Sequence, residues 1–214
     1  MYSQICSLLA GISKLNSGQA RNEATKMLKK EEYAAVLDFL PQGKAGEAKR
    51  EPVAQIIGTT YFTLLEVVSK PGTHLSLGEK VYIGKGVRDH IDHIKGRIAF
   101  NELTSSAQDR CRQEVRSIVV EREVEFISFL NRTGALNIRV HTLEMLPSIG
   151  KKHLMAILNA REQKPFANFA DVHDRVSSIG KIEDIFVERV ILELKGDEKY
   201  YLFAKAPSRE FERY

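Results

Sequence analysis

The chain has 214 residues, of which 43% are hydrophobic and 28% charged, and its net charge is +4 at neutral pH. This length suffices to bury a full core in one or two domains. No apolar run approaches the length of a membrane span, and Tyr2 to Leu15 lacks the basic and long apolar regions of a signal peptide, so we expect no membrane partner. Cys6 and Cys111 lie far apart without metal-ligand spacing, which predicts a reducing, cytoplasmic setting.

The charge differs slightly between the two halves of the chain. Residues 1–104 contain 14 basic and 11 acidic side chains, and residues 105–214 contain 18 and 17. A weakly basic chain permits an acidic partner without requiring one. Affinity for nucleic acid in the nearly neutral second half must therefore come from local geometry.

Residues 1–30 are predicted to be an N-terminal extension without assigned function, which either contains a short helix from Gln19 to Lys30 or is mobile throughout. From Glu31 the pattern changes to short strands. We expect strands at residues 33–40, 53–57, 61–68, 80–83 and 97–100, with a short helical stretch containing Val87, Ile91 and Ile94 before the last strand. This order predicts a small OB-like β-barrel over residues 31–104.

Such barrels bind nucleic acid through exposed aromatic side chains that stack on bases and through flanking basic side chains. The candidates are Lys44, Arg50, Tyr82, Lys85 and Arg88, together with Tyr61, Phe62 and Lys49. About half of the aromatic side chains on alternating strands face a core, so the pattern does not decide which of them reach a ligand.

The run from Asp89 to His93 places two histidines and two carboxylates close together. A metal site is one interpretation. The solvated face of a short helix, with Ile91 and Ile94 turned inward, is the one we favour, because no further ligand cluster accompanies the histidines. We therefore predict no metal and no cofactor.

A long helix is predicted from Ser105 onward, because Cys111, Val115, Ile118, Phe126 and Phe129 fall near one face. Arginines and glutamates alternate on the opposite face, which is typical of a solvated, ion-paired surface. We expect this helix to end at residues 131–134 and to connect the barrel to a second, helical unit over residues 105–196. Thr142 is predicted to cap the next helix.

The segment from Leu146 to Lys152, Leu-Pro-Ser-Ile-Gly-Lys-Lys, predicts a helix, a tight turn and a second helix. Pro147 ends the first helix, Gly150 is free to take a positive φ, and Ile149 should fill the space between the helices. The second helix would begin with unpaired N–H groups beside Lys151 and Lys152, an arrangement that favours an anion such as phosphate.

These residues resemble the helix-hairpin-helix motif of non-sequence-specific nucleic-acid-binding proteins, Leu-Pro-Gly-Ile-Gly followed by a helix ending in Arg, here Arg161. Ser148 stands where that motif has Gly, and a serine is strained if the position needs a positive φ. The alternative is an ordinary αα-hairpin without a ligand.

Ser148-Ile149-Gly150-Lys151 recurs thirty residues later as Ser178-Ile179-Gly180-Lys181. An internal repeat indicates two supersecondary units that share one core. The segment 165–172 between them resembles the connector of tandem hairpins, where an aromatic side chain packs between the units. The second copy lacks the proline and precedes Glu183 and Asp184, so we expect Gly180 and Lys181 to form the weaker phosphate site.

Residues 197–214 are predicted to form a C-terminal strand or extended segment at 199–203, able to close against the barrel, and a frayed tail. The fold class is therefore α+β and multi-domain: an OB-like barrel followed by an all-α tandem helix-hairpin-helix domain.

Most of the chain from Glu31 onward resembles a largely archaeal family of proteins of unknown function, usually described as predicted nucleotide- or RNA-binding. The resemblance rests on Phe62–Glu66, Arg97-Ile98 with Glu102–Thr104, Leu143–Lys152 and Lys199–Phe203. It implies the fold and a broad binding class, but no catalytic residue.

The leading hypothesis is a non-catalytic nucleic-acid-binding protein, with RNA favoured over DNA. Its binding residues would be Ser148, Ile149, Gly150, Lys151, Lys152 and Arg161, then Gly180 and Lys181, and the barrel candidates named above. The alternatives are a DNA-binding protein, a protein-interaction adaptor, and a metal-dependent nuclease using Asp89, Asp92 and His93.

Overall fold

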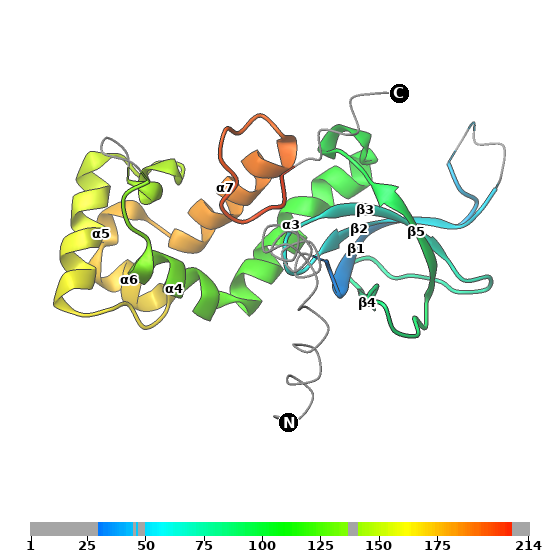
Figure 1. Ribbon diagram of the computed structural model, residues 1–214, viewed down its shortest axis with the longest axis horizontal. Coiled ribbons are helices and arrows are strands. Elements are labelled where there is room, and N and C mark those ends of the chain that lie inside the picture. The colour runs from blue at the N-terminus through cyan, green and yellow to red at the C-terminus, as the bar shows by residue number, and fades with distance from the viewer. Residues whose placement is uncertain (1–29, 45, 47–49, 137–140, 207–214) are drawn as a thin grey trace, which may run out of the picture.

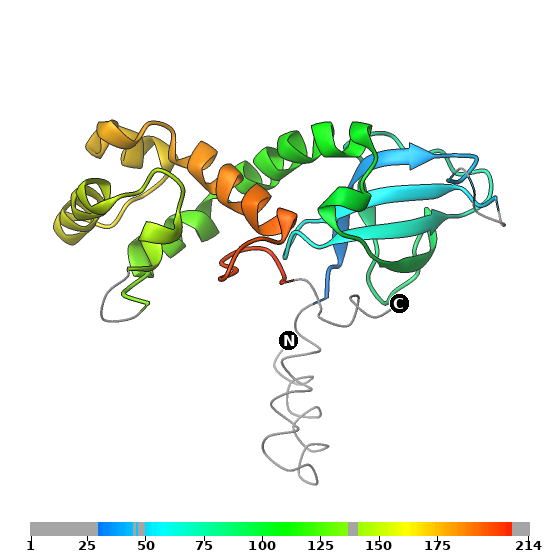
Figure 2. The same cartoon turned by 90° about the horizontal axis from the view of Figure 1, so that it is seen from above.

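The computed structural model describes residues 30–44, 46, 50–136 and 141–206 (Figure 1). Candidate Lys49, the predicted tail at 207–214 and all but the last residue of the predicted helix from Gln19 to Lys30 lie outside this part. A curled sheet occupies one end of an elongated molecule, and the hairpin helices occupy the other (Figures 1 and 2).

The sheet has five strands: β1 (Tyr33–Leu40), β2 (Val53–Gly58), β3 (Leu64–Ser69), β4 (Lys80–Tyr82) and β5 (Ile91–Arg97). Their spatial order is β4-β1-β2-β3-β5, and every neighbouring pair is antiparallel. Ala34 and Val36 of β1 share one apolar cluster with side chains of both edge strands, such as Val81 and Ile91. Because both edges contribute to this cluster, that face is the inside of the curl, and the sheet is a half-barrel.

The opposite face of the sheet packs against the helices. Ala35, Leu37 and Ile57 belong to a second cluster, which continues through Cys111 and Val115 of helix α3 (Ser105–Glu121) to the hairpins. The strand alternation explains this division, since successive side chains of β1 point to opposite faces. One continuous core therefore joins the sheet to the helices.

The helical part begins with a 3-10 turn, η1 (Phe100–Glu102), before α3, and α4 (Glu123–Arg132) follows α3. The first hairpin joins η2 (Thr142–Met145) to α5 (Lys151–Gln163), and α6 (Phe169–Arg175) follows. The second hairpin joins η3 (Ser177–Ile179) to α7 (Ile182–Lys195).

The predicted helix around Val87 to Ile94 is wrong. Residues 91–97 form β5, and the segment predicted as the fifth strand, 97–100, mostly follows it. The free edge of β3 supplies the reason, because pairs such as Val68 with His93 satisfy backbone groups that a helix would have to pair locally.

The predicted strand from Tyr61 begins instead at Leu64. The carboxylate of Glu31 accepts the N–H groups of Thr60, Tyr61 and Thr63 at 2.9, 2.9 and 3.1 Å, which holds these residues in the β2–β3 turn. Phe62 in this turn has φ of 51° and is 1% exposed. Its ring is therefore part of the core and not a stacking surface.

The predicted long helix is interrupted at Arg122, whose φ and ψ are −102° and 25°. Its Nη1 donates to the carbonyl oxygens of Thr59 and Thr60 at 3.0 and 2.8 Å, and its guanidinium lies over the rings of Phe62 and Phe126. A contact with the β2–β3 turn thus accompanies the break, and local helix propensity could not predict it.

Two further elements differ from expectation. The first half of hairpin 1 is a single 3-10 turn, and its N-cap is His141 rather than Thr142, with Nδ1 accepting the Leu143 N–H at 3.1 Å. Residues 199–203 form no strand; they run beside α7, and the chain reaches the sheet unit where the Lys205 N–H donates to the Tyr61 carbonyl.

Candidate nucleic-acid interface

The first hairpin presents its turn to solvent while one side chain anchors it. Ile149 is 3% exposed and packs in the helical core, as its place in the turn predicted. Gly150, Lys151 and Lys152 are exposed. Gly150 is the N-cap of α5, and the first intrahelical bond joins the Leu154 N–H to the Gly150 carbonyl at 2.9 Å. The preceding N–H groups have no partner within the helix, so they are available to an anion.

Positive φ falls on Ser148 and not on Gly150. Ser148 has φ of 63°, so the serine occupies a conformation that L-residues rarely adopt. Gly150 has φ of −86°, which contradicts the expectation that it uses glycine's freedom in the turn. A Cβ added to Gly150 would meet no atom within 4 Å. Neither its backbone nor its neighbours therefore require glycine at this position.

Arg161 has a structural partner that its place in the motif did not reveal. Its Nη1 donates to the carbonyl oxygens of Leu130 and Thr133, at 2.7 and 2.8 Å, and so caps the C-terminal end of α4. The side chain is half-buried. Within the described chain Arg161 thus joins α5 to α4, whereas the exposed charge beside the hairpin comes from Lys151 and Lys152.

The second hairpin repeats the sequence but not the backbone. Here Gly180 has the positive φ, 70°, and Lys181 is the exposed N-cap of α7. The acidic side chains that follow pair with α3: Asp184 bonds Arg116, and Glu188 bonds Arg112 at 2.5 Å. Glu183 and Asp184 lie in the first turn of α7, where an incoming phosphate would meet negative charge.

Lys44 and Arg50 lie in the loop between β1 and β2. Lys44 forms an ion pair with the buried carboxylate of Glu66, whose other oxygen lies 3.0 Å from Lys95 Nζ. Burial raises the pKa of Glu66, but its bonds to Lys44 and Lys95 outweigh that effect and hold the pKa below its ordinary value. Lys44 therefore neutralises an internal charge, while Arg50 is exposed.

Tyr82, the last residue of β4, lies beside Lys85 and Arg88 of the loop between β4 and β5. The Tyr82 hydroxyl accepts the Gly86 N–H at 3.1 Å, and Arg88 Nε donates to the Gly84 carbonyl at 2.9 Å. A Cβ on Gly84 would lie 2.4 Å from the Tyr82 hydroxyl oxygen. Tyr82 thus fixes the loop, and its ring also packs edge-on against Tyr33.

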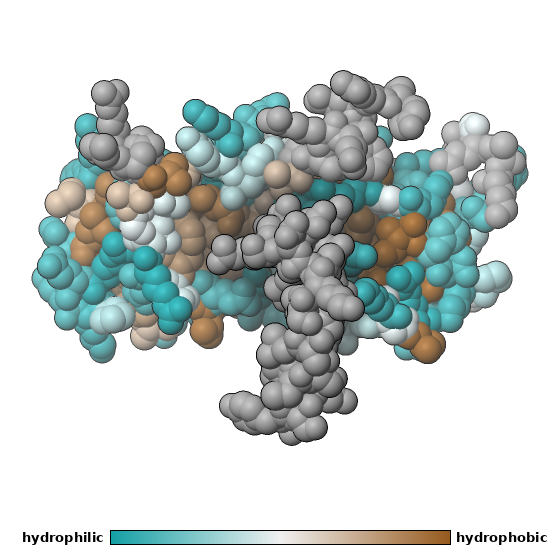
Figure 3. Space-filling view, viewed as in Figure 1, coloured by the Kyte–Doolittle hydropathy of each residue, from teal (hydrophilic) through white to brown (hydrophobic). Residues whose placement is uncertain are grey.

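This loop borders a cavity of about 490 Å³ at the open side of the half-barrel, between β4 and β5. Tyr82, Lys85 and Arg88 line it, as do Arg97 and Lys30, which the sequence reasoning missed as binding residues. The sequence could not reveal that Lys30 and Arg97 lie near each other, because they come from segments more than sixty residues apart. Figure 3 shows an apolar area bordered by hydrophilic surface at this end of the molecule.

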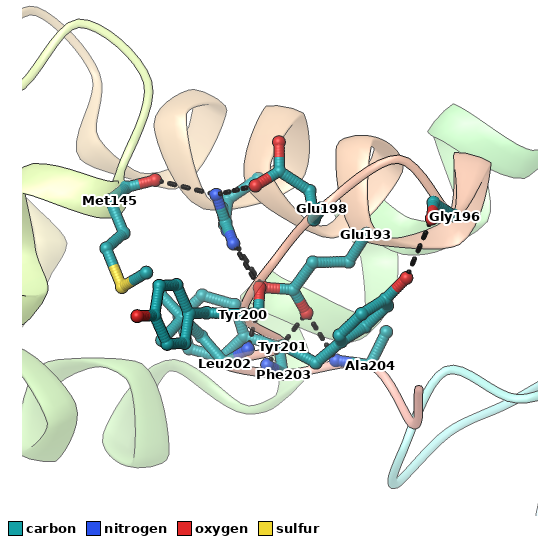
Figure 4. A network of polar contacts seen from close by, with 10 residues as sticks. Met145, Glu193, Gly196, Glu198, Tyr200, Tyr201, Leu202, Phe203 and Ala204 are labelled. Atoms are coloured by element: carbon teal, nitrogen blue, oxygen red, sulfur yellow. Dashed lines mark hydrogen bonds and ion pairs between the residues drawn. The ribbon is translucent and has the colours of Figure 1, made fainter. Parts of the chain in front are cut away.

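A buried ion pair fixes the C-terminal segment beside the first hairpin (Figure 4). Arg189 and Glu193 of α7 are 3% and 2% exposed, and Arg189 Nε donates to Glu193 Oε1 at 2.8 Å. Arg189 also donates to the Met145 carbonyl of η2 at 2.9 Å and to Glu198 at 2.8 Å. Sequence periodicity missed this network, since both residues fall on an otherwise apolar helix face.

The Asp89–His93 run lies in the loop before β5 and on β5, not on a helix. His93 Nδ1 lies 2.7 Å from Asp92 Oδ2, and His90 Nδ1 lies 3.7 Å from Glu79 Oε1. In the part of the chain that the structure describes, no three His, Cys, Asp or Glu side chains form a group that could hold a metal ion. None of the helices described there is long and apolar enough to cross a bilayer.

The protein is of the α+β class, with a curled antiparallel half-barrel joined through one helix to two helical hairpins. Comparison with known proteins identifies its family. Residues 30–205 match the family described as "Protein of unknown function (DUF655)". The chain is 42% identical over 183 residues to the uncharacterised protein MJ0038 of Methanocaldococcus jannaschii, covering 84% of this chain and 82% of that one. The protein therefore belongs to the DUF655 family.

A solved structure is similar as well. The crystal structure of Af1531 from Archaeoglobus fulgidus, from the same family, superposes with a TM-score of 0.77 and 38% sequence identity, covering 82% of this chain and all of that one. Both relatives come from archaea. The architecture described here is thus shared within the family.

Proposed function

We propose that the protein is a non-catalytic nucleic-acid-binding protein whose first hairpin binds backbone phosphate. The observation that carries the proposal is Gly150: its backbone is ordinary, a Cβ there would meet open space, and two exposed lysines follow it at the start of α5. Glycine at such a position allows a ligand to approach the backbone closely. A phosphate oxygen suits the N–H groups and the adjacent ammonium groups.

The architecture supports the same proposal. We assign the two hairpins to the helix-hairpin-helix type and the sheet to the OB type, because the sheet is a five-stranded, partly open barrel. Neither Lys151 nor Lys152 has an ion-pair partner among the described residues, so both charges are available to a ligand. We favour RNA over DNA because the half-barrel adds a basic cavity suited to unpaired nucleotides.

The test measures binding of structured RNA, single-stranded RNA and duplex DNA over a salt series. The variant Lys151→Glu with Lys152→Glu should lower affinity about tenfold and reduce the slope of log K against log salt by about 2. Lys181→Glu at the second hairpin is the matched control and should have a much smaller effect. Failure of the wild type to bind any of the three at low salt refutes the proposal, as does an equal loss in both variants.

Gly150→Ser separates binding from folding. Serine caps a helix at least as well as glycine, and the position has an ordinary φ and open surroundings, so the melting temperature should not fall. The added side chain should nevertheless weaken binding by keeping phosphate away from the backbone. Unchanged affinity would show that no ligand approaches Gly150.

One observation favours a protein-interaction adaptor as a second candidate. Val120 and Val124 are 54% and 80% exposed, and Val124 borders a cavity of about 520 Å³ together with Phe166 and Pro165. Exposed apolar surface of this kind occurs at protein interfaces. Val124→Asp should leave nucleic-acid binding unchanged if the hairpin is the site, and should abolish binding of a protein partner if the adaptor function is correct.

A further inference from the structure

The cavity between the two free edges of the half-barrel combines an apolar floor with a basic rim. Leu65, Ile83 and Ile94 contribute the floor, and all three pack in the cluster inside the curl. Lys30, Lys85 and Arg88 contribute the rim. At about 490 Å³ the cavity falls within the range of small-molecule sites, which commonly pair apolar walls with a few placed polar groups.

The charge around the cavity is positive on balance. Five basic and two acidic residues line it. One of the acidic residues, Glu31, already accepts three backbone N–H groups. Neither Lys30 nor Lys85 has an ion-pair partner among the described residues, so their charges face a ligand. The favoured ligand therefore carries negative charge.

The loop that carries Lys85 and Arg88 is already ordered. The Tyr82 hydroxyl accepts the Gly86 N–H, and a side chain at residue 84 would clash with the same hydroxyl. Arg97 is oriented too, because its Nη2 donates to the carbonyl oxygens of Lys205 and Ala206 at 3.0 and 3.1 Å. The loop backbone and Arg97 therefore lose little freedom when a ligand binds, which is the advantage of a preorganised site.

We propose that this cavity binds one nucleotide, with its base on the apolar floor and its phosphate on the basic rim. The shared chemistry is a nucleoside monophosphate unit, taken either from a free nucleotide or from an unpaired position in an RNA strand. An extended acidic peptide suits the cavity less well, because it would need a free strand edge and one of the two edges here, β4, has only three residues. The RNA source rests on the proposed function; the free nucleotide does not.

The experiment titrates the full chain with adenosine 5′-monophosphate, inorganic phosphate, an oligoribonucleotide of mixed sequence and a Glu-rich peptide, followed by the amide NMR signals of Gly84 and Gly86. Adenosine monophosphate should bind about tenfold more tightly than phosphate, because the base adds apolar contact. Lys30→Glu with Lys85→Glu should raise its Kd about tenfold, since two exposed charges are reversed. Lys70→Glu, outside the cavity lining, is the matched control and should leave the Kd unchanged.

The outcomes separate this site from the hairpin. The variant Lys151→Glu with Lys152→Glu should leave mononucleotide binding intact. The cavity proposal can therefore be correct even if the hairpin proposal fails. Tighter binding of the oligoribonucleotide than of the mononucleotide, lost in the cavity variant, identifies RNA as the source; equal binding identifies the free nucleotide. Equal affinity for phosphate and nucleotide, binding of the peptide alone, or nucleotide binding unaffected by the cavity variant overturns the proposal.

Discussion

Replacing Glu193 by glutamine should destabilise the protein severely. The two carboxylate oxygens accept Arg189 Nε and the N–H groups of Leu202, Phe203 and Ala204, at 2.7 to 2.9 Å. An amide retains one oxygen but turns its NH₂ group toward backbone N–H donors, and it leaves the buried Arg189 with only the partly exposed Glu198 as counter-charge. Loss of one partner of a buried ion pair costs about 3–5 kcal/mol, and we expect Glu193→Gln to fall in this range.

Glu198→Gln provides the matched control, since Glu198 bonds the same guanidinium from a partly exposed position, with 28% of its side chain accessible. Its loss should cost about 1 kcal/mol or less. Urea unfolding followed by circular dichroism measures both variants, and hydrogen exchange of the Leu202 and Ala204 amides reports whether the C-terminal segment detaches. A cost for Glu193→Gln no greater than that for Glu198→Gln would refute the reasoning.

Three further predictions concern single residues. Ser148→Gly should raise the free energy of unfolding relative to Ser178→Gly by about 1 kcal/mol, because only Ser148 has a positive φ; equal effects in urea titrations would contradict this. Burial raises the pKa of the Cys111 thiol to about 12, so in a Cys6→Ser background a thiol reagent should label the protein only after unfolding, and rapid labelling of the native protein would disprove the burial. Burial, followed by the charge of Arg161, lowers the pKa of His141, so the unfolded chain takes up its proton first; stability should be complete above the ordinary histidine pKa and should decline as the pH falls toward the depressed folded pKa, and His141→Gln should flatten that decline in urea midpoints.

The sequence by itself determined most of the strands, the hairpins and their anchors. Short apolar runs bounded by turn residues identified β1 and β2, because both signals depend only on local order along the chain. The turn residues Pro147 to Gly150 located the first hairpin, although the positive φ expected of Gly150 falls on Ser148, and the buried Ile149 follows from its place in the turn. The strain expected of Ser148 at a glycine position is confirmed by its φ of 63°.

The tertiary structure decided the features that depend on distant partners. Residues 91–97 form a strand because β3 offers an unpaired edge, although their apolar spacing also fits a helix. The helix breaks at Arg122 where that residue meets carbonyl oxygens of the β2–β3 turn. Arg161 caps α4, and Lys44 neutralises Glu66. Two basic residues that the sequence predicted to bind nucleic acid therefore have partners inside the fold.

The basic cavity also combines features that the sequence predicts with features that only the tertiary structure determines. Lys85 and Arg88 are three residues apart in one loop, so the sequence alone could place them near each other. Lys30 and Arg97 join them only because the sheet curls until β4 and β5 face each other across an opening. Periodicity specifies which side of a strand is apolar, but the curl that brings two sheet edges together is set by packing among all five strands.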